Sequence, residues 1–285
     1  MPSLDAVTIA GAMEACRRRL LGVSDTPALD ARVLASHVIG LDASALIAYG
    51  DSRLDGRRRD ALMALAERRA RGEPIAYIVG SKEFCGLKIA VNRKALVPRP
   101  ETEELVMAVV ADWPGRSAEI VDVGTGSGAV ACALAYHLSD ARVTATDSSA
   151  DALDVARQNV DQLGLEDRVS LVLGDLFDAV APDQRFDAIV ANLPYVREAD
   201  PELHEDVRAF EPHQALFAGA DGLDVYRRLF AAAPRHLAPG GRVYCECGPS
   251  TADGLLKIAR RAFPAAQVEL RPDASGRARM VIAGT

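Results

Sequence analysis

Cysteine, histidine and long apolar runs are scarce in this sequence, and each scarcity excludes a class of protein. The five cysteines are scattered and odd in number, which indicates reduced thiols rather than a disulfide framework. The five histidines show no metal-ligand spacing. Cys245 and Cys247 are the only close cysteine pair, and in a strand they would point to opposite faces. No metal site is therefore expected.

Nothing in the sequence indicates a membrane or a secretory route. No run approaches the roughly 18 apolar residues that a membrane-spanning helix needs. The opening MPSLDAVTIA lacks the charged-then-apolar pattern of a signal peptide. We therefore expect a cytoplasmic protein with no membrane partner.

What the sequence does have is an ordinary globular composition, with 49% hydrophobic and 26% charged residues in 285. This length suffices for one large domain, or for a medium domain and a small one. The net charge of −7 argues against a surface built mainly to hold bare nucleic acid.

Helical periodicity fills the N-terminal part of the chain. Apolar residues recur there at three-to-four spacing, and glycines stand where helices would stop. The predicted helices cover residues 7–21, 27–39, 43–49 and 57–71. We interpret residues 1–73 as a small helical domain.

The pattern changes over residues 74–100. Residues 75–79 and 87–91 are expected to form two short strands, so this segment is predicted to be a β-hairpin linker. Pro98 and Pro100 then force an extended approach to a helix that runs to about residue 113.

Strands and helices alternate from residue 119 onward. This alternation predicts an α/β fold over residues 101–285, with a mostly parallel seven-stranded sheet covered on both faces. The last two strands are joined by a short turn, so the sheet should end in an antiparallel hairpin. The predicted strands are residues 120–123, 143–147, 170–173, 188–191, 242–246, 267–271 and 279–283. The predicted helices are residues 129–137, 150–163, 223–237 and 252–263.

A glycine-rich loop, DVGTGSG, follows the first of these strands and opens a helix. Gly124, Gly126 and Gly128 let the backbone turn sharply and let a ligand approach it closely. The spacing differs from the G-x-G-x-x-G of dinucleotide-binding loops. A tight strand-to-helix connection without a ligand is the alternative for a glycine loop taken alone.

Two acidic residues stand where the next strands end. Asp147 ends the strand after the glycine loop, where a carboxylate can accept hydrogen bonds from both ribose hydroxyls of a nucleoside. Asp175 and Leu176 follow the third strand and could contact an adenine amine and an adenine face. An aspartate that caps a turn would explain Asp175 nearly as well. Together these features favour an adenosine-containing ligand.

The fourth strand ends in Asn192-Leu193-Pro194-Tyr195, an amide, a rigid proline and an aromatic ring with no acid or base beside them. The Asn192 side-chain oxygen and the Leu193 main-chain carbonyl could each accept one N–H of a planar amide. Pro194 would keep that carbonyl aimed, because its ring fixes φ and restricts the residue before it. Tyr195 would lie against the amide. Such fixed acceptors stabilise positive charge that develops on a bound amide nitrogen.

These motifs together resemble the class I S-adenosylmethionine-dependent methyltransferases, and more specifically the peptide chain release factor N5-glutamine methyltransferases. The resemblance covers nearly the whole chain. It rests on GEPIAYIVGSKEF, LVPRPETEELV, DVGTGSG, NLPYV and FEPHQALFAGADGLDVYRRL. Leu193 stands where the family usually has a proline, Leu176 where it commonly has an aromatic residue, and Cys247-Gly248-Pro249 departs from its usual fifth-strand end.

The resemblance implies a cofactor, a substrate and site residues. The cofactor would be S-adenosylmethionine, with S-adenosylhomocysteine as product and no metal. The cofactor-binding positions would be Asp122, Gly124, Thr125, Gly126, Ser127, Gly128, Asp147, Asp175, Leu176 and Asn192. The catalytic and substrate-binding positions would be Asn192, Leu193, Pro194 and Tyr195, with Arg99 and Glu103 at the substrate mouth. An ion pair with a purely structural role is the alternative for Arg99 and Glu103.

The implied substrate is the glutamine of the Gly-Gly-Gln motif in class I release factors, with the helical domain holding the rest of the partner and the enzyme acting as a monomer. An adenine N6-methyltransferase acting on nucleic acid is the rival hypothesis, because an adenine amine offers the same planar nitrogen to Asn192 and Tyr195. The acidic charge and the lack of a separate basic recognition domain stand against it. A non-catalytic adaptor is a third class, which the intact loop and Asn192 disfavour.

Overall fold

The structure is a computed structural model that describes residues 7–201 and 203–284. The chain divides into two compact units, Met1–Gly80 and Ser81–Thr285. Gly80 lies at this division with a φ of 76°, a left-handed conformation that glycine adopts without strain.

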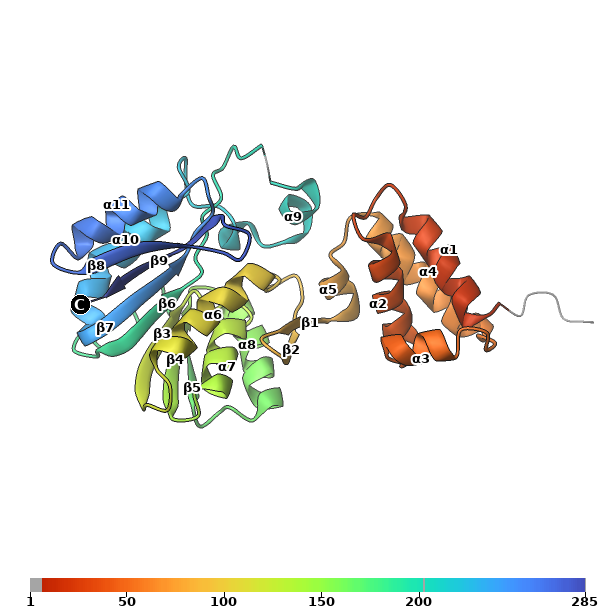
Figure 1. Cartoon of the computed structure of the whole chain (residues 1–285), viewed down its shortest axis with the longest axis horizontal. Helices are drawn as coiled ribbons and strands as arrows, with labels where there is room; N and C mark the ends of the chain where they lie inside the picture. The colour runs from red at the N-terminus through yellow and green to blue at the C-terminus, as the bar shows by residue number, and fades with distance from the viewer. Residues whose placement is uncertain (1–6, 202, 285) are drawn as a thin grey trace, which may run out of the picture. The chain divides into compact units, whose positions relative to one another are not determined.

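The first unit is helical, as the sequence predicts (Figure 1). Polar side chains fix where its helices begin. Thr8 accepts from the main-chain N–H of Gly11, and Asp42 and Asp55 accept in the same way at two later helices. The helices are α1 Ile9–Leu20, α2 Pro27–Ile39, α3 Ala43–Ala48, α4 Gly56–Ala70 and α5 Ile75–Val79.

One prediction in this unit is wrong: residues 75–79 form the helix α5, not a strand. Pro74 stands at its N-terminus and Gly80 ends it. Ile78 is buried in the core of the helical unit, and Ile75 and Val79 pack against that core. A five-residue apolar run has no periodicity that separates helix from strand, so tertiary packing decided its conformation.

The second unit begins with a hairpin of β1 Ser81–Phe84 and β2 Leu87–Ala90, which confirms the second of the two predicted hairpin strands. The prolines at 98 and 100 lead into α6 Pro100–Asp112, whose first turn carries Glu101 and Glu103. Acidic side chains suit this end of a helix because of the macrodipole.

A seven-stranded sheet with order β5-β4-β3-β6-β7-β9-β8 forms the centre of this unit, and β9 runs antiparallel to both of its neighbours, β7 and β8. Its strands are β3 Ala118–Val123, β4 Ala141–Asp147, β5 Val169–Leu173, β6 Phe186–Ala191, β7 Leu237–Glu246, β8 Gln267–Pro272 and β9 Ala278–Gly284. The predicted α/β fold with its antiparallel end is therefore confirmed.

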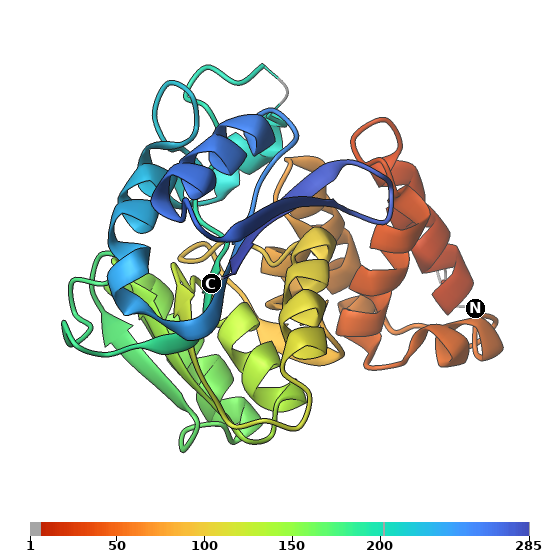
Figure 2. The same ribbon diagram turned by 60° about the vertical axis from the view of Figure 1, so that its left-hand side comes forward.

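Helices cover the sheet on both faces, with α6, α7 and α8 grouped on one side and α10 and α11 on the other (Figures 1 and 2). The side chains of Val121, Ile189 and Val243 share one core with Tyr226 of α10 and Leu255 of α11. Alternate strand residues thus face this helical layer, as the two-residue period of a strand requires. The helices are α7 Ala129–His137, α8 Ala150–Leu163, α10 Asp224–His236 and α11 Ala252–Ala262.

Two short helical segments, α9 Glu205–Phe210 and the 3-10 turn η1 His213–Ala215, lie between β6 and α10, where the sequence pattern predicts no element. Within the described ranges, no helix is both long enough and apolar enough to cross a membrane.

The strand order reverses between β3 and β6. The chain proceeds from β3 to β4 and β5 on one side, and then returns to place β6 and β7 on the other. Parallel sheets bind ligands at such a switch point, outside the carboxyl ends of the strands. The glycine loop follows β3 and the Asn192-Leu193-Pro194-Tyr195 motif follows β6, so both predicted motifs meet at this point.

Candidate active site

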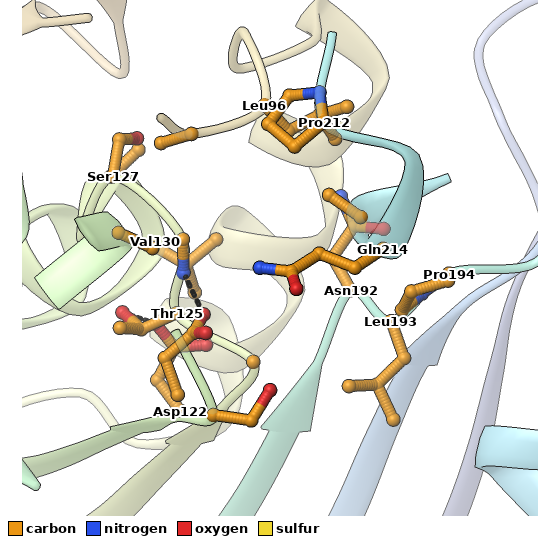
Figure 3. Close-up of a pocket in the computed structure, with 18 of the residues that line it drawn as sticks. Leu96, Asp122, Thr125, Ser127, Val130, Asn192, Leu193, Pro194, Pro212 and Gln214 are labelled. Atoms are coloured by element: carbon orange, nitrogen blue, oxygen red, sulfur yellow. Dashed lines mark hydrogen bonds between the residues drawn. The ribbon is translucent and has the colours of Figure 1, made fainter. Parts of the chain in front are cut away.

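A cavity of about 240 Å³ lies at the switch point. Most of the predicted site residues line it: Arg99, Asp122, Gly124, Thr125, Gly126, Ser127, Asp147, Asp175, Leu176, Asn192, Leu193 and Pro194. Figure 3 shows Thr125 and Val130 on one side of the cavity and Asn192 and Pro212 on the other. Gly128, Tyr195 and Glu103 do not belong to the lining residues.

The glycine loop is held by main-chain hydrogen bonds. The N–H groups of Gly124 and Thr125 both donate to the carbonyl of Thr146, at 2.8 and 2.9 Å. Gly124, Gly126 and Gly128 all have φ between 56° and 77°, in the left-handed region. A Cβ on Gly128 would lie 3.0 Å from the Ala156 Cβ, so this glycine permits close packing of α7 on α8.

Asp147 connects the glycine loop to the end of β4. One carboxylate oxygen accepts from the Gly126 N–H and the other from the Ser149 N–H, each at 2.8 Å. Burial raises the pKa of Asp147, and these main-chain donors act in the opposite direction. A carboxylate has about four lone-pair positions, so Asp147 keeps acceptor capacity toward the cavity.

Asp122, near the end of β3, is more deeply buried than Asp147. Its Oδ2 accepts from the Thr125 hydroxyl at 2.6 Å and from the Ala131 N–H at 3.1 Å. Burial raises the pKa of this carboxyl to about 7. Asp122 thus fixes the glycine loop to the first turn of α7.

Asp175 and Leu176 line the cavity after β5, and their predicted contacts with adenine stay a prediction. The Asp175 carboxylate already accepts from Arg228 at 2.6 Å. Leu176 has a φ of 53°, which is uncommon for a residue other than glycine. Strained backbone of this kind collects at ligand sites, where the surrounding structure holds it in place.

The side chains of Thr102 and Tyr226, which are not part of the Asn192-Leu193-Pro194-Tyr195 motif, hold its first two residues by hydrogen bonds. The Asn192 amide nitrogen donates to the Thr102 hydroxyl at 3.0 Å, which engages the donor end of the amide and leaves Oδ1 to accept. The Leu193 N–H donates to the Tyr226 hydroxyl at 3.2 Å.

Tyr195 is not among the residues that line the cavity, and it contacts Glu246 and Gly248 instead. Its hydroxyl donates to Glu246 Oε1 at 3.2 Å, and a Cβ on Gly248 would lie 3.3 Å from its ring. Burial raises the pKa of Tyr195 above its ordinary value, so the hydroxyl stays protonated. The prediction that its ring covers a substrate amide stays a prediction.

Of the two residues predicted at the substrate mouth, Arg99 lines the cavity and Glu103 does not. Arg99 lines the cavity and donates to Glu211 at 2.5 Å, and Glu211 also accepts from the Val97 N–H at 3.2 Å. This pair connects the PRPETE and FEPHQAL segments.

Figure 3 shows the Gln214 side chain extending from the Pro212 side into the cavity, toward Val130.

Five supporting residues were missed in the sequence: Thr102, Asn159, Glu211, Tyr226 and Glu246. Asn159 is buried on α8, where it donates to the carbonyls of Ala90 and Ser127 and accepts from the Ala90 N–H. An asparagine on the apolar face of a helix is a usable signal for such a role, because buried polar groups need partners. Thr102 carries no comparable signal.

Residues 7–201 and 203–284 contain no group of three or more histidine, cysteine or acidic side chains arranged to hold a metal ion.

Comparisons with known proteins give the class first and then the family. Residues 120–213 match a methyltransferase domain, and a methyltransferase from Pyrococcus furiosus shares the fold at 22% identity and a TM-score of 0.52, over 70% of this chain and 89% of that one. The second unit is therefore a Rossmann-like methyltransferase domain. Residues 12–80 match the PrmC N-terminal domain.

Two relatives identify the family within the methyltransferases. The release factor glutamine methyltransferase of Rhodopirellula baltica is 39% identical over 90% of this chain and 89% of its own length. That of Moorella thermoacetica is 40% identical over 95% of both. The chain belongs to the release factor glutamine methyltransferase family.

Proposed function

We propose that this protein transfers a methyl group from S-adenosylmethionine to the side-chain amide nitrogen of the glutamine in the Gly-Gly-Gln motif of class I release factors. The observation that carries the proposal is the Asn192–Thr102 hydrogen bond. It turns the Asn192 oxygen into a fixed acceptor at the edge of the cavity that the glycine loop and Asp147 also line.

The cavity residues fit this cofactor. The left-handed Gly126 has open space at its missing Cβ, so a ligand can approach its main chain. Asp147 offers acceptor positions for ribose hydroxyls, and Leu176 and Val130 provide apolar walls for an adenine ring. When bound, S-adenosylmethionine would supply a methyl group on a positively charged sulfur, which is a good leaving group because it becomes a neutral thioether.

The chain's own residues position the substrate amide. Asn192 Oδ1 and the Leu193 carbonyl each accept one N–H of the glutamine side chain, so that its nitrogen lone pair is directed at the methyl group. These acceptors also stabilise the positive charge that develops on nitrogen as the N–C bond forms and the S–C bond breaks, and the nitrogen then loses one of its two protons to water. Pro194 keeps the Leu193 carbonyl aimed, and most of the rate comes from holding the two reactants in line.

We propose further roles for the parts of the chain. Residues 1–73 recognise the body of the release factor, residues 74–100 link the two functions, and residues 101–285 carry the chemistry. The protein acts as a cytoplasmic monomer without a metal. The matches to the PrmC N-terminal domain over residues 12–80 and to a methyltransferase domain over residues 120–213 support a recognition part followed by a catalytic part.

Methylation by the purified protein tests the proposal. The protein is incubated with trideuteromethyl S-adenosylmethionine and a class I release factor, and the peptide masses are measured. We expect one added methyl group on the Gly-Gly-Gln peptide, lost when that glutamine is changed to glutamate. Label on duplex DNA or ribosomal RNA instead would support the adenine hypothesis and overturn ours.

Two variants sharpen this test. Asn192→Ala should lower kcat at least about 100-fold, because it removes one acceptor of the developing charge. Gln162→Ala removes an exposed amide on α8 and should leave the rate unchanged. Near wild-type transfer by Asn192→Ala would show that the mechanism is wrong.

A further inference from the structure

Glu246 is a buried carboxyl at the end of β7 that the proposed chemistry does not use. Its exposed fraction is 1%, and its Oε2 has no hydrogen-bond partner among the residues that the structure describes. Burying a carboxyl is costly unless its surroundings compensate. A residue held at this cost beside the cavity motif needs an explanation.

The contacts of Glu246 lead to three of the four motif residues. Its Oε1 accepts from the Tyr195 hydroxyl at 3.2 Å. Its main-chain carbonyl accepts from the Tyr226 hydroxyl, whose oxygen in turn accepts from the Leu193 N–H. The interaction of the Thr102 hydroxyl with the Glu246 carboxyl lowers the pKa of that carboxyl, and Thr102 is the residue that holds the Asn192 amide.

We propose that Glu246 is the positioning residue of the Asn192-Leu193-Pro194-Tyr195 motif. Its carboxyl acts through Thr102 on the Asn192 amide and directly on the Tyr195 hydroxyl. Its main-chain carbonyl, which every variant at this position keeps, holds the Tyr226 hydroxyl beside the Leu193 N–H. This inference rests on the proposed function for its kinetic consequence, although the geometry it describes is independent of the methyl acceptor.

The hydrogen-bond directions explain why an acceptor is needed at position 246. The Asn192 amide donates to Thr102 Oγ1, so the Thr102 hydroxyl hydrogen is available for an acceptor. Tyr195 donates as well. The Glu246 carboxyl offers two oxygens and so can accept from both hydroxyls, an arrangement that would orient the Asn192 oxygen and the Tyr195 ring. Leucine at this position would leave the Tyr195 hydroxyl without its acceptor and would remove the carboxyl that interacts with the Thr102 hydroxyl.

Arg279 and Glu101 are charged groups that act on the Glu246 carboxyl. Arg279 acts to lower its pKa and Glu101 acts to raise it, whereas burial has the largest effect and raises it. Arg279 is itself paired with Asp273 at 3.0 Å, so its charge is shared. The hydrogen bonds of Glu246, rather than an ion pair of its own, therefore set the geometry of the motif.

The kinetic test compares Glu246→Leu with Glu246→Gln. Glutamine keeps an Oε1 that accepts from Tyr195, so it should stay within about fivefold of the wild-type kcat. Leucine should lower kcat about 100-fold, because small displacements at a reacting centre cost that much. The dissociation constant for S-adenosylmethionine, measured by calorimetry, should change less than about threefold. Equal kcat in all three proteins, or a loss confined to cofactor affinity, would overturn the proposal.

Double variants separate positioning from general stability. If Glu246 acts through Tyr195 and Thr102, Glu246→Leu should cost little further rate in a Tyr195→Phe, Thr102→Val background. Glu269→Leu is the control, since this glutamate lies on β8 and pairs with Arg271. It should leave kcat unchanged. Fully additive losses would contradict a shared path.

A measurement without substrate keeps this inference distinct from the proposed function. In nitrogen-15 labelled protein, the Asn192 side-chain amide signals are identified by their loss in Asn192→Asp. These signals should shift in Glu246→Leu and Thr102→Val and stay near their wild-type position in Glu246→Gln and Glu269→Leu. Unmoved signals in Glu246→Leu would refute the positioning role whatever the protein methylates.

Discussion

The Leu193 side chain lies directly against the main chain of Gly124. A Cβ added to Gly124 would stand 2.6 Å from Leu193 Cδ2, closer than real side chains approach. Leu193 is buried at this contact. The glycine loop and the substrate motif are thus in contact across the strand switch point, and each constrains which residue the other can carry.

Gly124→Ala should therefore be more damaging than Gly126→Ala. Both glycines have left-handed φ, but a Cβ on Gly126 meets nothing within 4 Å, whereas one on Gly124 meets Leu193. We expect Gly126→Ala to cost about 1 kcal/mol of unfolding free energy from backbone strain, and Gly124→Ala at least about 2 kcal/mol more from overpacking. Urea unfolding measures both. Equal costs would show that Leu193 gives way freely.

Leu193→Pro, which installs the residue usual in the family, should keep transfer within about tenfold of the wild-type rate. The Leu193 N–H donates to Tyr226, but Tyr226 still donates to the Glu246 carbonyl when that N–H is absent. No buried donor is left without a partner, and the main-chain carbonyl at 193 is retained. Methyl transfer to a Gly-Gly-Gln peptide measures this. A loss above about 100-fold would mean that the leucine side chain itself is required.

The position of the cavity was predictable because strand ends carry it. In a parallel sheet the carboxyl ends of strands meet at one edge, so Asp122, Asp147 and Asn192 fall together once the alternation of strands is recognised. Glycine spacing likewise marks the loop. These are local patterns, and the structure places all of them at the switch point.

The support for the motif was not predictable, because it comes from residues distant in sequence. Thr102 is 90 positions from Asn192, and Glu246 is 51 from Tyr195. Nothing near them in the chain indicates the pairing. The strand prediction for residues 75–79 was wrong for a related reason, because contacts with other helices decided the conformation of this segment.

Asp122→Asn should change how stability depends on pH. The folded-state pKa of Asp122 is raised to about 7 from 3.8, so the folded protein binds an extra proton between these values. The stability contribution of this group is therefore full below about pH 3.8 and is lost as the pH rises to about 7.

The asparagine variant does not titrate and can still accept from Thr125. Relative to Asp122→Asn, the unfolding free energy of the wild type should thus fall by up to about 1.4 kcal/mol per pH unit inside this window. Urea unfolding at several pH values measures the difference. A difference between the two proteins that stays constant across the window would refute the assignment.

Asn159→Ala should weaken both the fold and the cofactor site. Asn159 connects Ala90 of the hairpin to Ser127 of the glycine loop, and its removal leaves one N–H and two carbonyls without these partners. We expect a loss of about 2–4 kcal/mol in unfolding free energy, together with a cofactor affinity reduced about tenfold or more. Gln158→Ala, an exposed amide one residue earlier, is the control. Unchanged cofactor affinity in Asn159→Ala would show that the loop holds its shape alone.

The Arg99–Glu211 pair should respond asymmetrically to the removal of each partner. The Glu211 side chain is 1% exposed and that of Arg99 is 34% exposed. Arg99→Met strands a buried carboxylate, so it should cost about 3 kcal/mol of unfolding free energy. Glu211→Gln leaves an arginine that solvent can reach and a side chain that still accepts from Val97, so it should cost about 1 kcal/mol. Arg116→Met, at an exposed arginine, controls for loss of positive charge. If Glu211→Gln were the more damaging change, the pair would act mainly by holding Arg99 in the cavity rather than by compensating a buried charge.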